Sequence, residues 1–208
     1  QFPLVIFNNV KGSDIPLVAN MHASFERLRL ALGMEEGGIR EFLAECAARE
    51  SNAIEPEIVE TGPVHEVVVM GDEVDVKKLP LCTYHEKDAG KYITAGLSVM
   101  RDPESGINNV GIYRLMVHER NLLGIQLSET AHGHVIWRKH EIDGRPCPIA
   151  VVIGHHPAFF LGSLSFTPFD VDELHIAGGM LQRPVQLVLC KTIPLEVPAD
   201  AEIVLECE

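Results

Sequence analysis

The sequence predicts an α+β protein in which a small N-terminal α/β region, residues 1–60, precedes a strand-rich domain, residues 61–208. Three observations support this prediction. Residues 1–60 alternate between short apolar runs and stretches with helical spacing of apolar residues. After the turn signal Thr61-Gly62-Pro63 the sequence changes to short β-rich segments separated by Gly and Pro. Few long helical patterns interrupt those segments, which favours a barrel or a strongly bent sheet.

The N-terminal region is expected to begin with two strands, 3–8 and 16–20, on either side of the turn Lys11-Gly12-Ser13-Asp14. Ser24 is a suitable N-cap for a first helix that ends near Gly33. A second helix is predicted from an amphipathic stripe with i, i+3, i+4, i+7 spacing. The stripe consists of Ile39, Phe42, Leu43, Cys46 and Ala47.

The remainder of the chain is expected to be mostly strands, with two short helices. One helix is predicted at 157–161, and the other from the N-cap residue Asp170 to a stop at Ala177-Gly178-Gly179. Strands are predicted at 64–70, 92–100, 111–117, 148–154, 184–190 and 202–206.

Composition argues against several classes of partner. The formal net charge is −13 and no Lys/Arg cluster interrupts it, so neither nucleic acid nor an anionic membrane is an expected partner. No apolar run approaches the ~20 residues that span a bilayer, and no secretory signal is evident. The five cysteines are scattered, without the spacing of zinc or redox motifs. We therefore expect reduced thiols and a cytoplasmic protein.

Ten histidines offer ligands for a metal, but composition does not choose among them. His132 and His134 are two residues apart, so on a strand both would face one side, as a metal site requires. Hydrogen bonding on a surface strand explains such a pair at least as well. His155 and His156 would point to opposite faces of a strand, which argues against their sharing one ion.

Two charged residues stand out. Arg114 is the single charge in an otherwise apolar strand, so it belongs either to a structural ion pair or to a carboxylate-binding site. The residues alone favour the ion pair slightly. Glu173 follows Asp170 and Asp172, and acids in a first helical turn commonly complement the helix dipole.

Three stretches of the chain carry recognisable motifs in a fixed order. They are Gly90-Lys-Tyr-Ile-Thr-Ala-Gly96 with Asp102-Pro103, Gly106 and Asn109-Val-Gly-Ile-Tyr-Arg114; Pro148-Ile-Ala-Val-Val-Ile-Gly154 with Pro157-Ala158; and Asp172-Glu173 with Ala177-Gly178. In order and spacing they resemble the UbiD family of carboxy-lyases, which includes polyprenyl-hydroxybenzoate and ferulic acid decarboxylases. The resemblance extends to the Lys11-Gly12 turn and the 27–33 helix.

The resemblance implies a flavin-reductase-like split β-barrel that binds prenylated FMN through Mn²⁺ or Mg²⁺, with K⁺ nearby. The implied metal ligands are Asn109, His132 and Glu173, with His134 as an alternative to His132. Arg114 would orient the substrate carboxylate, and is the implied catalytic residue. The implied cofactor-binding residues are Asn109, Ile112, Tyr113, Arg114, Gln126, Leu127, Ser128, His132, Ser163 and Glu173.

The implied reaction is the reversible removal of CO₂ from an aromatic or α,β-unsaturated carboxylic acid, in a homo-oligomer that receives its cofactor from a flavin prenyltransferase. The family's acidic Glu-Gly-Pro-Phe-Gly-Glu segment is not found within the chain, whose two ends both fall in or beside strand patterns. We therefore expect a part of a longer polypeptide. The alternatives are a non-catalytic flavin-binding module and, more remotely, a metal-dependent hydrolase that uses the histidines.

Overall fold

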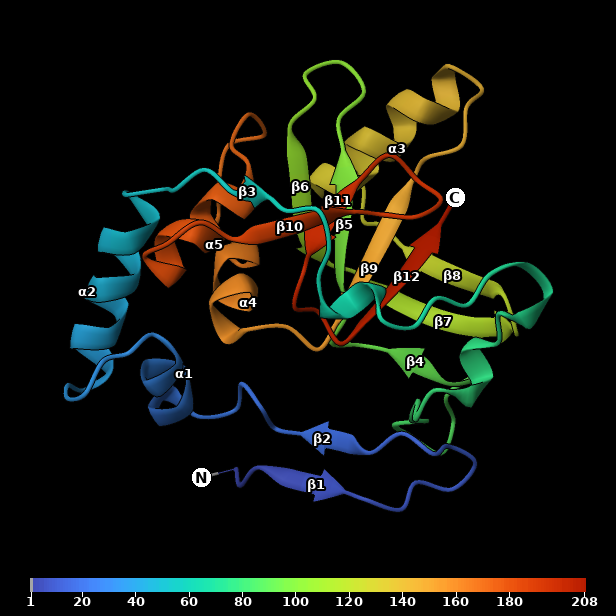
Figure 1. Cartoon of the computed structure of the whole chain (residues 1–208), viewed down its shortest axis with the longest axis horizontal. Helices are drawn as coiled ribbons and strands as arrows, with labels where there is room; N and C mark the ends of the chain where they lie inside the picture. Colours follow the sequence, from blue (N-terminus) through green and yellow to red (C-terminus); the bar gives the residue numbers. More distant parts are fainter. Residues whose placement is uncertain (1) are drawn as a thin grey trace.

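Residues 2–208, which the computed structural model describes, contain five α-helices and twelve strands arranged in four separate sheets (Figure 1). The helices are α1 (Phe25–Ala31), α2 (Ile39–Glu50), α3 (His132–Ile142), α4 (Pro157–Ser163) and α5 (Glu173–Leu181), with 3-10 turns η1 (Pro63–His65), η2 (Gly71–Glu73) and η3 (Val76–Lys78). The strands are β1 (Val5–Phe7), β2 (Leu17–Ala19), β3 (Glu57–Ile58), β4 (Tyr92–Ile93), β5 (Leu97–Arg101), β6 (Asn108–Ile112), β7 (Arg114–Glu119), β8 (Leu122–Gln126), β9 (Ile149–Ile153), β10 (Gln186–Leu189), β11 (Glu196–Pro198) and β12 (Ile203–Cys207). The predicted α+β class is confirmed.

The central sheet has the strand order β12-β9-β5-β6, and every neighbouring pair is antiparallel. Both of its faces are covered, because alternate residues of one strand enter different cores. Val99 of β5 packs with residues of α4 and α5, whereas its neighbour Met100 packs with Leu115 of β7 and Ile136 of α3. The sheet therefore holds α5 against one face and α3 against the other.

A second sheet, β4-β7-β8, adjoins the central one at a corner in the chain. β6 belongs to the central sheet and β7 to the second sheet, and the single residue between them is Tyr113. Within residues 2–208 no sheet closes into a barrel, because these two sheets remain separate.

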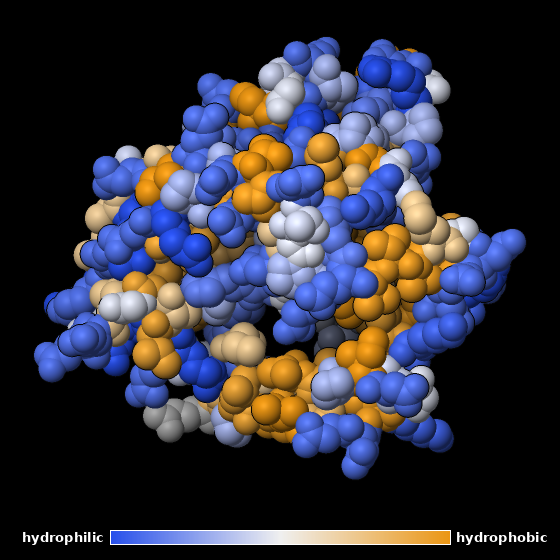
Figure 2. Space-filling model, in the orientation of Figure 1, coloured by the Kyte–Doolittle hydropathy of each residue, from blue (hydrophilic) through white to orange (hydrophobic). Residues whose placement is uncertain are grey.

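The N-terminal elements were predicted well. Both predicted helices form, and Gly33 follows α1 with a φ of +70°, a conformation that glycine adopts without strain. Only part of the predicted stripe of α2 is buried, since Phe42 is 3% exposed but Leu43 is 55% exposed. Apolar side chains also gather over β1 and β2 (Figure 2), where Ile6, Phe7 and Val18 are exposed.

Several local predictions were wrong. Residues 92–100 and 111–117, each predicted as one strand, are each divided between two strands of different sheets. Residues 64–70 form no strand: η1 begins at Pro63, and Val67–Met70 lie exposed without a partner strand. Helix α3, which carries His132 and His134, was not predicted, so the geometry that a strand would give this pair does not apply; Gly133, Ile136 and His140 recur at helical spacing on its buried face.

A further wrong prediction concerns α5. Its N-cap is Asp172 rather than Asp170, and the helix continues through Gly178-Gly179 to Leu181. The helix continues through the two glycines, which allow close packing against the N-terminal region. A Cβ atom at Gly178 would lie 2.3 Å from the carbonyl oxygen of Ile54, and one at Gly179 would lie 2.4 Å from that of Arg49.

Two predictions about the whole chain were also tested. All five cysteines are free thiols, as expected, and Cys147 is buried. None of the helices in the described residues combines the length and the apolar character that a membrane crossing requires.

Candidate active site

The site is built where the start of β6 meets the start of α5. The two consecutive asparagines of β6 contact the two consecutive acids of the helix: the Asn108 side-chain amide donates to Asp172 at 2.8 Å, and that of Asn109 donates to Glu173 at 3.1 Å. Asp172 also caps α5 by accepting a 2.8 Å hydrogen bond from the backbone N–H of Leu174. This double contact fixes where Glu173 lies relative to the sheet.

Glu173 is a buried carboxylate, only 3% exposed. It accepts hydrogen bonds from the backbone N–H of Val110 at 3.0 Å and from the Thr167 hydroxyl at 3.2 Å, in addition to the Asn109 amide. Burial raises the pKa of Glu173, although these hydrogen bonds oppose the shift. Among residues 2–208, no Lys, Arg or His side chain forms an ion pair with it.

Tyr113 connects this cluster to α3. Its hydroxyl donates to Asn109 Oδ1 at 2.9 Å and accepts from the backbone N–H of Gly133 at 3.0 Å. Burial raises the pKa of Tyr113, so the phenol stays protonated and can donate. Gly133 follows His132, so the hydrogen bonds bring the first turn of α3 next to Asn109.

The two predicted histidine ligands diverge. Residues two apart on an α-helix point about 200° apart around the axis, so His132 and His134 cannot share one face. The His132 ring makes an edge contact with Phe169, with 5.2 Å between ring centroids. The His134 ring instead lies 5.4 Å from that of Trp137 on its own helix. His132 is thus the one that contacts the segment leading to Glu173.

Arg114 is exposed at the start of β7 and is not in a structural ion pair within the described residues. Its guanidinium donates to the side-chain oxygen of Gln126, its direct partner on β8, and lies 5.9 Å from the ring centroid of Tyr92. Most of its N–H donors are therefore available to a carboxylate. The ion-pair alternative raised by the sequence does not apply here.

Within residues 2–208, the other predicted residues form no hydrogen bond to the Asn109–Glu173 cluster. Ile112 ends β6 and is 39% exposed. Leu127 and Ser128 lie between β8 and α3, and the Ser128 carbonyl accepts from the N–H of Ala131 at 2.9 Å. The Ser163 hydroxyl donates to the Phe160 carbonyl within α4.

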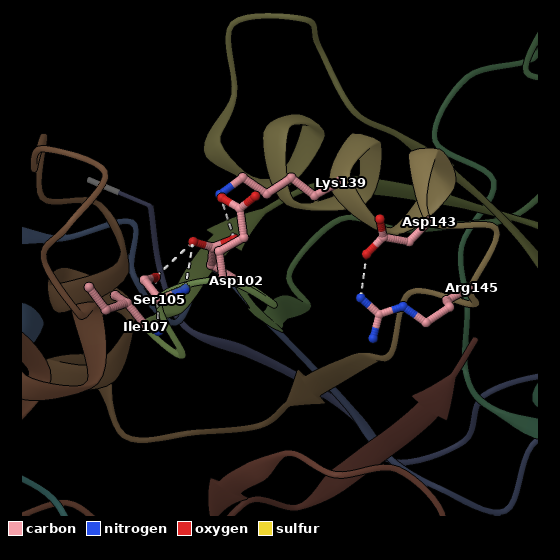
Figure 3. Close-up of polar contacts among 7 residues, drawn as sticks. Asp102, Ser105, Ile107, Lys139, Asp143 and Arg145 are labelled. Atoms are coloured by element: carbon pink, nitrogen blue, oxygen red, sulfur yellow. Dashed lines mark hydrogen bonds and ion pairs between the residues drawn. The ribbon is translucent and has the colours of Figure 1, made fainter.

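A second polar contact anchors α3 farther along its length. Asp102, only 3% exposed in the turn after β5, accepts from Lys139 at 2.8 Å and from the Ser105 hydroxyl at 2.7 Å (Figure 3). Burial alone would raise the pKa of Asp102, but the hydrogen bonds from Lys139 and Ser105 outweigh it and lower the pKa. The Lys139 ammonium also lies 5.2 Å from the centroid of the Phe169 ring, which His132 contacts as well.

The residues fit a divalent cation if an amide oxygen completes the ligand set. Residues 2–208 contain no group of three His, Cys, Asp or Glu side chains arranged for a metal. The Asn109–Glu173 pair, with His132 on the adjoining helix turn, offers two oxygens and a nitrogen. A buried carboxylate without a cationic partner is unfavourable, and a bound cation would offset that cost.

Two features of the site were not found from the sequence. Thr167 binds Glu173 from a loop where an isolated threonine carries no signal. The sequence shows two adjacent amides, Asn108-Asn109, and two adjacent acids, Asp172-Glu173, but nothing in it indicates that the two pairs contact each other. A separate pocket of about 140 Å³, lined partly by His155, His156 and Arg183, contains none of the predicted site residues.

Comparisons with known proteins agree in pointing to one family. The model of the 3-octaprenyl-4-hydroxybenzoate carboxy-lyase Rift-related domain (UbiD) matches residues 57–208, and that of the corresponding N-terminal domain matches residues 1–47. An uncharacterized protein of Aquifex aeolicus is 35% identical over 97% of this chain. The chain spans 45% of that relative's length.

Solved structures with the same fold are enzymes. The UbiD-class enzyme HmfF from Pelotomaculum thermopropionicum, in complex with FMN, superposes with a TM-score of 0.91 at 39% identity, over 98% of this chain and 45% of that one. An evolved dimeric form of HmfF is in complex with prenylated FMN. Apo 3,4-dihydroxybenzoic acid decarboxylase (AroY) from Klebsiella pneumoniae has a TM-score of 0.88 at 33% identity, over 98% of this chain and 43% of that one.

Proposed function

Because this chain belongs to the UbiD family of carboxy-lyases, we propose that it carries the cofactor site of a decarboxylase that uses prenylated FMN. The substrate would be an aromatic or α,β-unsaturated carboxylic acid, and the reaction would be reversible. The observation that carries the proposal is the buried Glu173 carboxylate, hydrogen-bonded to Asn109 beside the helix turn that bears His132, with no cationic side chain to neutralise it in the described part of the chain.

Asn109, His132 and Glu173 would hold Mn²⁺ or Mg²⁺, with Ser163 in the region of a K⁺ ion. A phosphate brings about two negative charges into such a site, and a hard cation with oxygen and nitrogen ligands offsets them. Asn109 Oδ1 has two lone pairs and uses one to accept from Tyr113, which leaves one for a cation. The ring contact between His132 and Phe169 supports His132 over His134 as the third ligand.

Arg114 would orient the substrate. Decarboxylation leaves an electron pair on carbon, which prenylated FMN, when bound, accepts as an electron sink. The role of the protein is to hold the departing carboxylate in line, and a guanidinium fork does this with two parallel hydrogen bonds. Gln126 accepts from Arg114 and so keeps the side chain extended along β7 and β8. The flanking Ile112, Tyr113, Leu127 and Ser128 would form the walls of the site.

The larger assembly belongs to the same proposal. We propose that the sheets on either side of Tyr113 form the split barrel that the family resemblance implies, in a domain that begins near residue 61. The proton donor would come from an acidic segment outside this sequence, the cofactor from a flavin prenyltransferase, and the working enzyme would be a cytoplasmic homo-oligomer. The dimeric form known for HmfF supports self-association in this family.

The test is to produce the protein together with a flavin prenyltransferase and to record the mass and absorbance of the bound cofactor and the identity of the bound metal. The proposal expects prenylated FMN with manganese. A preparation that binds zinc and no flavin would instead favour a hydrolase. If a full-length relative that carries this site binds the flavin but converts no carboxylic acid, the non-catalytic flavin-binding module is favoured.

A further inference from the structure

The N-terminus of α3 is capped from outside the helix. The first N–H groups of an α-helix have no partner within it, and an N-cap side chain usually accepts from the second or third of them. Here the N-cap residue is Ala131, which has no side-chain acceptor. The N–H of Gly133, the second helical residue, instead donates to the Tyr113 hydroxyl at 3.0 Å.

Tyr113 can reach this position because two glycines leave room for its ring. A Cβ atom at Gly111 of β6 would lie 2.8 Å from the ring carbon Cζ of Tyr113, and one at Gly133 would lie 2.6 Å from its hydroxyl oxygen. Both distances are far shorter than a van der Waals contact, so neither position accepts a side chain while the ring stays in place. The phenol is therefore held between β6 and α3 by close packing as well as by hydrogen bonds.

The same hydroxyl determines how the Asn109 amide is oriented. It donates its proton to Asn109 Oδ1 at 2.9 Å, while Asn109 Nδ2 donates to Glu173 at 3.1 Å. An amide turned by 180° would place its NH₂ group, a donor, against the phenol proton and its oxygen against the carboxylate. Tyr113 and Glu173 together therefore permit one orientation, with Oδ1 directed to the side where the first turn of α3 lies.

From these contacts we propose that Tyr113 is a positioning residue for the metal site, acting as a helix cap supplied by the corner between β6 and β7. It ties the turn that carries His132 to Asn109 and fixes which Asn109 atom faces that turn. The proposal rests on the proposed function, in that Asn109 and His132 are taken as ligands of one ion. It gives Tyr113 a role distinct from that of a wall beside the flavin ring.

The test compares wild type with Tyr113→Phe, which keeps the ring and deletes the hydroxyl. The matched control is Tyr84→Phe, which deletes an exposed tyrosine hydroxyl that is hydrogen-bonded to Thr94 at 2.6 Å. Two quantities are measured on the whole chain: hydrogen exchange of the Gly133 amide without metal, and Mn²⁺ affinity in the presence of FMN, from the electron paramagnetic resonance signal of the free ion.

The proposal expects Tyr113→Phe to speed exchange at Gly133 and to weaken Mn²⁺ binding by about 10- to 100-fold, the range typical of residues that orient metal ligands. Tyr84→Phe should change neither quantity. Unchanged exchange at Gly133, or faster exchange with unchanged Mn²⁺ affinity, would overturn the proposal. If wild type binds no Mn²⁺, the metal site of the proposed function fails, and the exchange result alone decides whether Tyr113 caps α3.

A second variant tests the contact between Tyr113 and Gly133 by changing the glycine. Gly133→Ala keeps the hydroxyl but places a methyl group against it, so it should weaken Mn²⁺ binding as well. Its control is Gly124→Ala, whose added methyl has the far end of the flexible His118 side chain as its nearest neighbour. Wild-type Mn²⁺ affinity in Gly133→Ala would contradict the close spacing on which the proposal depends.

Discussion

Glu173 and Asn109, which lie 64 positions apart in the chain, are joined by a 3.1 Å hydrogen bond that brings the start of α5 onto β6. The carboxylate has three hydrogen-bond donors and, within residues 2–208, no ion-pair partner. A cation bound at Glu173, as we propose, would offset the cost of burying this carboxylate.

Glu173→Gln should abolish stabilisation of the protein by Mn²⁺. At about one hundred times its dissociation constant, a ligand raises the free energy of unfolding by about 2.7 kcal/mol, and only wild type should show this gain. Without metal, the variant should lose about 1–2 kcal/mol, because its NH₂ group faces the Asn109 donor. Urea unfolding with and without Mn²⁺ measures both, with the exposed Glu141→Gln as the control. An equal gain from Mn²⁺ in Glu173→Gln would remove the residue from the ligand set.

Arg114→Ala should lower kcat/KM of the intact enzyme by at least about 100-fold while prenylated FMN stays bound, because the guanidinium is proposed to orient the substrate carboxylate, whereas Asn109, His132 and Glu173 are proposed to hold the cofactor through the metal. Arg114→Lys should recover little, since an ammonium lacks the planar fork. Stability should change by less than about 0.5 kcal/mol, because the side chain is exposed. Arg120→Ala, at the turn of the same hairpin, is the control. Undiminished turnover in Arg114→Ala would remove this residue from the mechanism.

Lys139→Met should destabilise the protein by about 2 kcal/mol, because it leaves the buried Asp102 carboxylate without its cation while Ser105 still donates to it. The midpoint of denaturant unfolding measures the loss. Arg138→Met, which removes an exposed pair with Glu141 on the same helix, should cost less than about 1 kcal/mol. Adding Asp102→Asn to Lys139→Met should restore part of the stability; a strictly additive double variant would mean that the two side chains are not coupled.

His155 should make the protein less stable in acid. Burial lowers its pKa from 6.5 to about 4, so between these two values the unfolded chain binds a proton that the folded protein does not. Stability is therefore lost as the pH falls from above 6.5 towards 4, by up to about 3 kcal/mol. His155→Gln should remove this part of the pH dependence, measured as unfolding free energy at pH 7 and pH 4.5. The exposed His85→Gln is the control, and an unchanged pH profile in His155→Gln would contradict the assignment.

Local sequence signals predicted the secondary structure correctly where an element is determined by its own residues. Ser24 and Gly33 bracket α1 correctly, and the apolar run before Gly154 forms β9. The same signals failed where contacts with distant parts of the chain determine the secondary structure. The valines of residues 64–70 favour a strand, but no neighbouring strand is present to pair with them among the described residues. The helix α3 has polar residues on much of its surface and no capping side chain, so its start carried no signal.

The candidate site could be proposed only through the resemblance to a family. Nothing in the spacing of Asn109, His132 and Glu173 indicates that they belong to one site, because periodicity reports neighbours on one element and not contacts between distant ones. The sequence patterns also left Arg114 undecided between two roles. The pairing of β7 with β8 places Gln126 opposite Arg114 and leaves most of the guanidinium N–H donors free, and neither feature can be read from the sequence.

The glycine pair inside α5 links the stability of this helix to the N-terminal region. Each glycine lowers the intrinsic tendency of the segment to be helical by about 1 kcal/mol relative to alanine, so α5 would be poorly formed as an isolated peptide. In the folded chain the carbonyl oxygens of Arg49 and Ile54 lie so close to Gly179 and Gly178 that no side chain fits at either position. The helix that carries Glu173 at its first turn therefore depends on packing against the N-terminal region and not on helix propensity alone.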